Sequence, residues 1–510
     1  MNNKPTKKDY PRRKAGFKAA EEVPSTLEQA EKIYQEEQSL SVIIQFKNKD
    51  DQESEPTGPP ISVPQNITTE QLQLLINNLL KNDEELPYSF FVDENEIVKS
   101  LKNHMQGQSE ETTLNILYQP QAVFRITPVT RCSSSMEGHT EAVLNSAFSP
   151  DGSGLASVGG DGTLRIWDLN TQTPIFTCKG HTNWVLQVSW SPDGKKIATG
   201  GMEGEIRIWN PKTGKQMGSV LRGHTKFITA LQWEPYHLNP NCTRLASSSK
   251  DATVKIWDTE SNKCLMTLSG HTMSVTCLRW SGEGLIYSGS QDRTIRVFNT
   301  NEGRLIRALE GHAHWVNSIA LNTDYVLRTG PFDHTGKHHD TKEEAQKAAL
   351  ERYNQVLNSV AGGTKGDVMV SGSDDFTCIV WNPAHAKAPV ARLAGHQQLI
   401  NLVSFSPNGR YFASASFDKS IKLWDAANNK FLGNFRGHVG AVYQVCWSSD
   451  SRYLVSGSKD STLKIWDIKT KKMTIELPGH ADEVYTVDWS PDGQSVVSGS
   501  KDRLLKIWRN

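Results

Sequence analysis

Long apolar runs are missing from this chain of 510 residues. No stretch approaches the ~20 apolar residues that cross a membrane, and no apolar segment of the kind found in secretory signals follows the basic start of the sequence. An excess of one charge is also missing, because 56 Lys and Arg residues balance 56 Asp and Glu residues. No overall field would therefore hold nucleic acid by counterion release alone. We expect a soluble, intracellular protein with no membrane partner.

Paired cysteines and catalytic signatures are missing as well. The 7 cysteines are odd in number, scattered, and never form Cys-x-x-Cys, which argues against a disulfide framework and against a zinc site. The sequence contains no P-loop, no Gly-x-Ser-x-Gly and no His-Glu-x-x-His pattern. We therefore expect no catalytic residues, no metal within this chain and no cofactor, and a protein that binds rather than catalyses.

A repeated Gly-His pair is the main positive feature. It occurs eight times, with glycine at positions 138, 180, 223, 270, 311, 395, 437 and 479. The intervals are 42, 43, 47, 41, 84, 42 and 42 residues, and all but one match the ~40–45 residues of a WD40 propeller blade. Each repeat ends in an alternating segment such as residues 163–167, which is typical of a strand with one buried face. The sequence predicts a mainly β fold with an eight-bladed propeller.

An acidic residue stands six positions before the terminal Trp or Phe of every repeat. The pattern resembles the WD40 family, and the resemblance implies that this acid and the Gly-His histidine share a buried hydrogen-bonded network with a Ser or Thr and the Trp. The predicted pairs are His139 with Asp161, His181 with Glu203, His224 with Asp251, His271 with Asp292, His312 with Asp375, His396 with Asp418, His438 with Asp460 and His480 with Asp502. A catalytic role for eight His–acid pairs is much less favoured than a structural role, because one activity does not need eight evenly spaced copies, whereas every blade needs its own buried polar contact. Glu203 in place of Asp and Phe298 in place of Trp predict weaker networks in blades 2 and 4.

Two parts of the propeller region, residues 122–510, need separate explanations. The last repeat stops after its third strand, so we expect residues 122–130 to supply the fourth strand and close the ring. The interval of 84 residues implies an insertion over about 324–366, which is rich in helix formers and marked at its end by two glycines. Its histidines, His334, His338 and His339, would suggest a metal, but adjacent histidines in a polar loop are more often solvated.

Residues 39–121 change to a globular composition. Strand patterns at 41–46 and 60–64, a capped helix beginning near residue 68, and further strands at 88–92 and 113–118 predict a ubiquitin-like β-grasp domain of α+β type. The predicted apolar side of the helix carries Leu72, Leu74, Leu75, Leu79 and Leu80.

Three segments make the sequence similar to the Notchless family of large-subunit ribosome assembly factors. They are residues 117–124 with 128–131, residues 311–317, and residues 332–337. The resemblance covers about residue 40 to the end. It implies a location in the nucleus and nucleolus, binding to pre-60S particles with their ribosomal proteins, assembly factors and rRNA, and a monomeric chain.

The same resemblance implies a partner, the dynein-like AAA ATPase midasin. In that family the partner's metal-ion-dependent adhesion domain grips the ubiquitin-like domain, and an acidic residue before the last strand completes the coordination of the partner's Mg²⁺. Counting back from Tyr118 assigns this role to Glu111, with the neighbouring Glu110 as the alternative. A loop carboxylate suits a hard cation. The sequence alone favours a solvated acidic loop, and only the resemblance to the family assigns the metal to Glu111.

The basic start of the chain and the mouth of the ring supply further candidates. We expect residues 1–38 to be a disordered tail whose Lys7, Lys8, Arg12 and Arg13 act as a nuclear localisation signal, as an arm on ribosomal RNA, or only as a solubilising segment. Trp184, Phe227 and Trp315 stand at positions that WD40 rings place near the channel mouth, where they either anchor a partner or pack between blades. A competing function is that of an adaptor in Notch-type signalling or in the ubiquitin system, since propellers have many roles.

Overall fold

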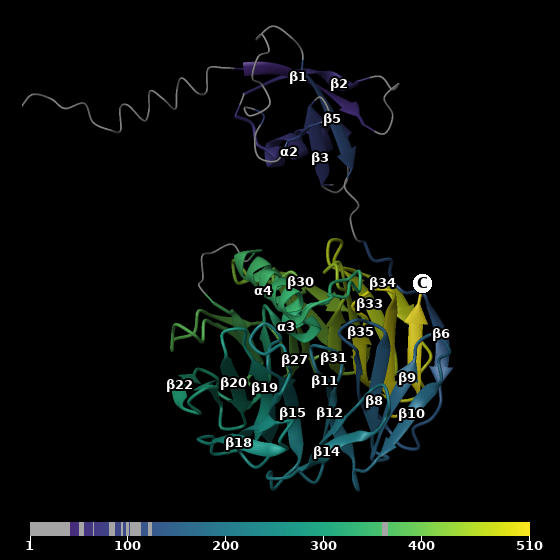
Figure 1. Cartoon of the computed structure of the whole chain (residues 1–510), viewed down its shortest axis with the longest axis vertical. Coiled ribbons are helices and arrows are strands. Elements are labelled where there is room, and N and C mark those ends of the chain that lie inside the picture. Colours follow the sequence, from purple (N-terminus) through teal and green to yellow (C-terminus); the bar gives the residue numbers. More distant parts are fainter. Residues whose placement is uncertain are drawn as a thin grey trace, which may run out of the picture. The chain divides into compact units, whose positions relative to one another are not determined.

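The computed structural model describes residues 41–49, 56–64, 66–80, 87–92, 95–97, 101, 114–120, 125–359 and 366–510. The chain divides into two compact units, Met1–Val123 and Phe124–Asn510 (Figure 1). The basic residues Lys7, Lys8, Arg12 and Arg13 lie outside the described residues, as do Glu110 and Glu111. Across the described part, the helices are too short or too polar to cross a membrane.

The described residues of the first unit form a mixed sheet and the helix α2 of 12 residues. Its elements are β1 (Ser41–Asn48), β2 (Thr57–Pro64), α2 (Thr69–Leu80), β3 (Tyr88–Val92), β4 (Asn95–Glu96) and β5 (Leu114–Pro120). The strand order is β2-β1-β5-β3-β4, and β1 runs parallel to β5 at the centre of the sheet. This is the arrangement that we predict for a ubiquitin-like domain.

Local sequence explains where α2 begins and which side it buries. The backbone N–H of Thr68 donates to the Gln71 side chain, and the backbone N–H of Gln71 lies 3.5 Å from the Thr68 hydroxyl, which together form a capping box. Leu72 and Ile76 are buried against the sheet. The prediction for Leu74 is wrong, because 49% of this residue is exposed, and Ile76 takes its place on the buried side.

The second unit contains eight four-stranded antiparallel sheets, which confirms the predicted eight-bladed propeller. From inner to outer strand, blades 1 to 4 are β7 (Val143–Phe148), β8 (Gly154–Gly159), β9 (Thr163–Asp168), β10 (Pro174–Lys179); β11 (Val185–Trp190), β12 (Ile197–Gly201), β13 (Ile206–Trp209), β14 (Gln216–Leu221); β15 (Ile228–Trp233), β16 (Arg244–Ser249), β17 (Val254–Asp258), β18 (Lys263–Leu268); and β19 (Val275–Trp280), β20 (Leu285–Ser290), β21 (Thr294–Asn299), β22 (Leu305–Glu310).

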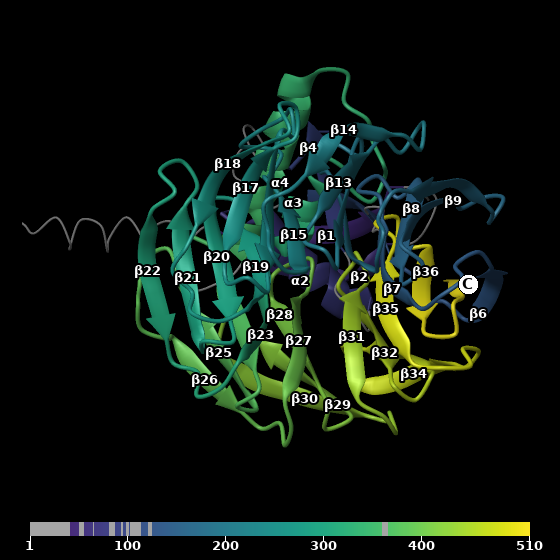
Figure 2. The ribbon, with the colours of Figure 1, turned by 90° about the horizontal axis from the view of Figure 1, so that it is seen from below.

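Blades 5 to 8 repeat this order, except that the outermost strand of blade 8 comes from the start of the unit. They are β23 (Val316–Leu321), β24 (Met369–Ser373), β25 (Thr377–Trp381), β26 (Ala391–Ala394); β27 (Ile400–Phe405), β28 (Tyr411–Ser416), β29 (Ser420–Asp425), β30 (Lys430–Arg436); β31 (Val442–Trp447), β32 (Tyr453–Ser458), β33 (Leu463–Asp467), β34 (Lys472–Leu477); and β35 (Val484–Trp489), β36 (Ser495–Ser500), β37 (Leu505–Arg509), β6 (Arg131–Met136). Each inner strand lies beside the next, and β35 lies beside β7, so the ring is closed (Figure 2).

The closing strand lies later in the sequence than we predict. The strand is β6, which pairs antiparallel with β37 from Arg131 opposite Arg509 to Met136 opposite Leu505. Residues 125–130 form no strand. Pro128 helps to explain the difference, because it has no backbone N–H to donate to a ladder.

The insertion in blade 5 contains two helices, α3 (Asp324–Thr329) and α4 (Lys342–Ser359), which lie at one end of the ring (Figure 1). Ala345 and Ala349 of α4 pack into the core of blade 3 with Tyr236 and Trp233. Further along α4, the Ser359 hydroxyl donates to the backbone carbonyl of Asn408 in blade 6. Helix α4 therefore reaches from blade 3 to blade 6 instead of projecting into solvent.

Candidate functional site at the mouth of the propeller channel

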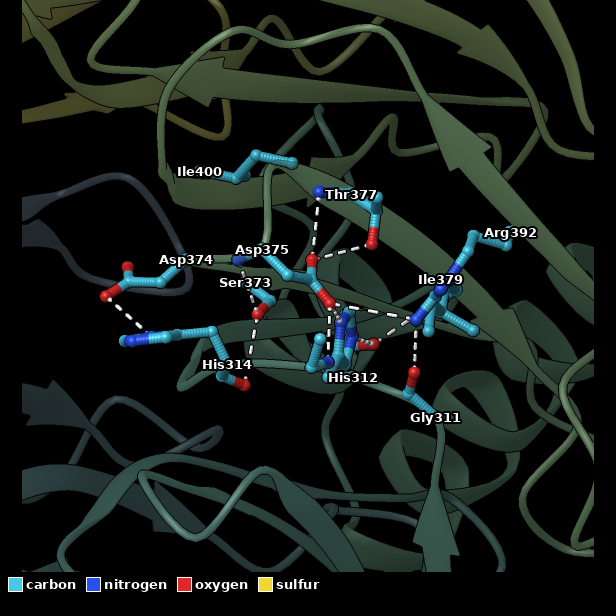
Figure 3. A network of polar contacts seen from close by, with 12 residues as sticks. Gly311, His312, His314, Ser373, Asp374, Asp375, Thr377, Ile379, Arg392 and Ile400 are labelled. Atoms are coloured by element: carbon cyan, nitrogen blue, oxygen red, sulfur yellow. Dashed lines mark hydrogen bonds and ion pairs between the residues drawn. The ribbon is translucent and has the colours of Figure 1, made fainter.

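A buried polar network fixes the loops at one end of every blade, and blade 5 shows its geometry (Figure 3). His312 Nδ1 lies 2.9 Å from Asp375 Oδ2, and its Nε2 lies 2.7 Å from the Ser371 hydroxyl. A carboxylate only accepts, so Nδ1 carries the proton and Nε2 accepts from Ser371. Ser371 in turn accepts from the Trp381 indole at 2.8 Å, and Asp375 also accepts from the hydroxyl and N–H of Thr377.

Six other blades repeat the histidine–aspartate contact. His139, His224, His271, His396, His438 and His480 lie 2.7–2.9 Å from Asp161, Asp251, Asp292, Asp418, Asp460 and Asp502, respectively. Burial alone would raise the pKa of each of these aspartates. Hydrogen bonds from the histidine, from the backbone and, in most blades, from a Thr or Ser outweigh burial and hold the pKa well below its usual range. The acids are therefore ionised and serve the fold.

In blade 2 the predicted acid is wrong. Glu203 is exposed, and Glu205 instead lies 3.0 Å from His181 Nδ1, in an orientation that does not form a hydrogen bond. Glu205 occupies the position four before Trp209, where most other blades carry Thr or Ser, and its longer side chain reaches the histidine from there. A glutamate at this position is the feature of the sequence that could have indicated that Glu205, and not Glu203, faces the histidine. Burial lowers the pKa of His181 to about 4.

Blade 4 lacks the indole donor, as its sequence implies. Phe298 stands in place of Trp, and the Ser288 hydroxyl keeps its contact with His271 Nε2 at 2.8 Å. This blade therefore has one fewer hydrogen bond in its network than blade 5.

The end of the channel opposite these loops is occupied by α3. Arg328 Nη1 lies 2.9 Å from Asp488 in blade 8, and Arg279 of blade 4 donates to Asp324 at 3.0 Å. Together with Tyr325, these side chains line a channel cavity of about 310 Å³. The other end of the channel, where the Gly-His loops lie, is therefore the end that is open to a partner. We call it the open mouth.

The open mouth is a concave surface of about 720 Å³ with aromatic walls. Trp184 and Phe227 both line it, and Trp184 is 48% exposed. The ammonium of Lys250 lies 5.0 Å from the centre of the Phe227 ring. Trp315, 39% exposed, does not line this hollow. It lies against His314, which pairs with Asp374 at 3.3 Å.

Two tyrosines on the other side of the mouth were not predicted. Tyr443 and Tyr485 line the hollow with ring centres 5.8 Å apart, and Phe417 packs edge-on against Tyr443. The Tyr443 hydroxyl donates to Glu483 at 3.0 Å, and burial together with this carboxylate raises the pKa of Tyr443 to about 12. The signal was present in the sequence, since both tyrosines directly follow the first residue of an inner strand.

The described residues contain no group of three His, Cys, Asp or Glu side chains that could hold a metal ion. The mouth instead offers aromatic faces, a phenol held by a carboxylate, and exposed ammonium groups. These are the features of a surface that recognises another macromolecule.

Both units match known protein families. Residues 42–105 match the family described as the NLE (NUC135) domain. The family described as WD domain, G-beta repeat matches eight stretches, at 130–168, 172–210, 215–258, 262–299, 348–382, 387–425, 429–467 and 471–509. A computationally designed protein, Ika8, has a similar crystal structure, with a TM-score of 0.58, 25% identity, and coverage of 74% of this chain and 100% of that chain.

Relatives from a plant and a yeast cover most of the chain, and a relative from an insect covers nearly half of it. The Notchless protein homolog of Arabidopsis thaliana is 56% identical over 392 residues, which are 76% of this chain and 81% of that protein. Ribosome assembly protein 4 of Saccharomyces cerevisiae is 52% identical over 413 residues, which are 78% of this chain and 80% of that protein. Protein Notchless of Drosophila melanogaster is 61% identical over 236 residues, 46% of this chain and 48% of that protein. With its NLE domain and eight WD repeats, this chain belongs to the Notchless family.

Proposed function

We propose that this protein is a ribosome assembly factor that acts on precursors of the large subunit in the nucleus and nucleolus. The relatives named ribosome assembly protein 4 support this role, because they are 52% and 46% identical to this chain over 78% and 72% of its length. A more distant relative, 30% identical over 157 residues, is named as a ribosome biogenesis protein. The role is that of a scaffold, which fits a ring whose buried His–acid pairs serve the fold.

The ring docks through its open mouth in this proposal. The observation that carries this is the difference between the two ends of the channel: α3 and its ion pairs occupy one end, and exposed Trp184 and half-buried Phe227 stand at the other. Large aromatic side chains in a concave surface are preferred anchors for a protein partner. Trp315 extends the same face as a second contact point.

The ubiquitin-like domain presents Glu111 to midasin in this proposal. In the sequence, Glu111 precedes by three positions Leu114, the first residue of the central strand β5. The Mg²⁺ belongs to the ATPase, and the carboxylate fills a coordination position that its adhesion domain leaves open. ATP hydrolysis in the partner then pulls on the domain and releases the factor from the particle.

A binding experiment tests the role of Glu111. We expect Glu111→Ala and Glu111→Asp to abolish Mg²⁺-dependent binding to the isolated adhesion domain, because the metal loses its carboxylate or the carboxylate falls short. Glu110→Ala is the matched control and should bind normally. Unchanged affinity of Glu111→Ala in Mg²⁺ would refute the assignment, and loss of binding only in Glu110→Ala would move the role to the neighbouring residue.

A further inference from the structure

The seam of the ring lies at the N-terminal edge of the propeller. The outermost strand of blade 8 is β6, which is held to its own sheet only through its pairing with β37. Strand β6 is also the first strand after the segment that leads from the ubiquitin-like domain. Any tension on the first unit would therefore enter the propeller through the residues that directly precede β6.

The six residues before β6, residues 125–130, are bound to two blades. Ile126 N–H donates to Asp450 Oδ2 of blade 7 at 2.9 Å, and Thr130 N–H donates to the Arg509 carbonyl of blade 8 at 3.0 Å. The Asn510 side chain donates to the Thr127 hydroxyl at 3.0 Å. We call residues 125–130 the clasp.

The clasp also buries two apolar side chains. Ile126 is 5% exposed and Val129 is fully buried, and both pack in one cluster with Tyr453 of blade 7 and Trp508 of blade 8. Side chains that join the cores of two blades resist removal, because pulling them out exposes apolar surface in both. The clasp therefore fastens the chain across the boundary between blades 7 and 8.

The two carboxylate oxygens of Asp450 have separate tasks. Oδ1 accepts from the Ser448 hydroxyl at 2.6 Å and from Arg452 N–H at 3.1 Å, which shapes the turn between β31 and β32. Oδ2 accepts from Ile126 in the clasp. The same turn in blade 6 is built on Asn408, whose Oδ1 accepts from the Ser406 hydroxyl and from Arg410 N–H. An amide is therefore sufficient for the turn, and the second oxygen of Asp450 serves the clasp.

We infer that the clasp locks the closing strand of the ring and takes up tension that arrives through the ubiquitin-like domain. The source of that tension rests on the proposed function, but the lock itself is a property of the isolated chain. Without the clasp, force on the first unit would open the pairing of β6 with β37 from its Arg131 end, one hydrogen bond after another. With it, blades 7 and 8 share the force.

The variant Asp450→Asn separates the clasp from the turn. It keeps an Oδ1 acceptor for Ser448 and Arg452, as Asn408 shows, and replaces the acceptor of Ile126 N–H by a donor. Asp193→Asn is the matched control, because Asp193 forms the same turn in blade 2 with Ser191 and Lys195. In the full chain, we expect Asp450→Asn to speed amide hydrogen exchange in β6 about tenfold, which corresponds to ~1.4 kcal/mol. Exchange in β6 that is equal in the two variants would overturn the lock.

A pulling experiment tests the tension. The handles are attached at the N-terminus and at Cys264, which is exposed on β18 of blade 3, with the other exposed cysteine, Cys132, replaced by serine in every form. We expect the first opening event of the propeller at a lower force in Asp450→Asn than in Asp193→Asn or the parent. Equal opening forces in all three would show that β6 resists alone. Neither measurement uses ribosomes or ATPase, so failure of the proposed function would leave both results unchanged.

Discussion

At the scale of single residues, the stability of the ring depends on buried polar atoms that must all find partners. Ser371 illustrates this, because its hydroxyl serves both His312 Nε2 and the indole of Trp381. In blade 4 the corresponding Ser288 serves only the histidine, since Phe298 brings no donor. The same substitution should therefore cost different amounts in the two blades.

We predict that Ser371→Ala destabilises the protein by about 2–6 kcal/mol, because it leaves two buried groups unpaired at about 1–3 kcal/mol each. Ser288→Ala should cost about half as much. Denaturant unfolding of both variants at neutral pH measures the difference. Equal losses would mean that the indole of Trp381 contributes nothing to the network.

His181 is one of several groups that make the stability depend on pH. Its pKa in the fold is lowered to about 4 by burial, against about 6.5 in an unfolded chain. A histidine whose folded pKa is lowered contributes fully above pH 6.5, and the contribution is lost as the pH falls towards 4. The network aspartates also have lowered pKa values, and their contribution to stability is lost only below about pH 4.

Asp367 acts in the opposite sense, because burial raises its pKa to about 7 and the fold therefore gains stability from this acid as the pH falls from 7 towards 4. The two effects oppose each other in the melting temperature, so titration of the histidine ring itself is the test. We predict that NMR titration of the folded protein gives His181 a pKa near 4, and that the melting temperature falls steeply below pH 4, where the network aspartates become protonated. A His181 ring that titrates near pH 6.5 in the folded protein would contradict its assignment as a buried neutral histidine.

At the scale of elements, β6 decides whether the ring closes. A chain that starts at residue 137 lacks this strand and leaves β37 as an unpaired edge, whereas a chain that starts at 125 keeps both the clasp and the strand. We predict a lower and broader thermal transition for the shorter chain. Calorimetry of the two chains side by side tests this, and identical, equally cooperative transitions would show that β6 is dispensable.

Elements with a strong repeat could be predicted from the sequence, and elements that depend on distant contacts could not. The alternation before each terminal Trp predicted the third strands, because one face of each must be buried. The sequence predicts the closing strand too early because residues 122–129 have the position and alternation of a strand, whereas Ile126 within this segment binds Asp450 of blade 7. That contact joins residues more than 300 positions apart, and periodicity carries no information about it.

The same reasoning applies to the candidate site. Trp184 and Phe227 could be predicted to stand at the mouth because they follow Gly-His at a fixed distance. Glu205 was missed, although a glutamate at a position where most blades carry Thr or Ser was a visible difference, because its role depends on how far one side chain reaches inside the turn. The position of α3 in the channel could not be predicted from the sequence either, since it depends on ion pairs such as Arg328 with Asp488 that form only in the closed ring.

At the scale of the whole molecule, the propeller is a closed ring with one open mouth and one occupied end. Its core is divided among the blades, and α4 contacts blades 3 and 6 across the occupied end. Such a ring changes shape little when a partner binds, so contacts at its mouth and forces on its seam act on one rigid body. This suits a scaffold whose partners supply the chemistry.

In the proposed function, this ring carries the protein on precursors of the large ribosomal subunit. Sucrose-gradient sedimentation of cell extracts tests it directly, with the parent chain, the mouth variant Trp184→Ala with Phe227→Ala, and a control, Phe431→Ala, whose side chain is exposed on the outer strand β30. We predict that the parent and the control migrate with large-subunit precursors and that the mouth variant moves to the soluble fractions. A parent chain found only in the soluble fractions would contradict the account and favour an adaptor in signalling or in the ubiquitin system.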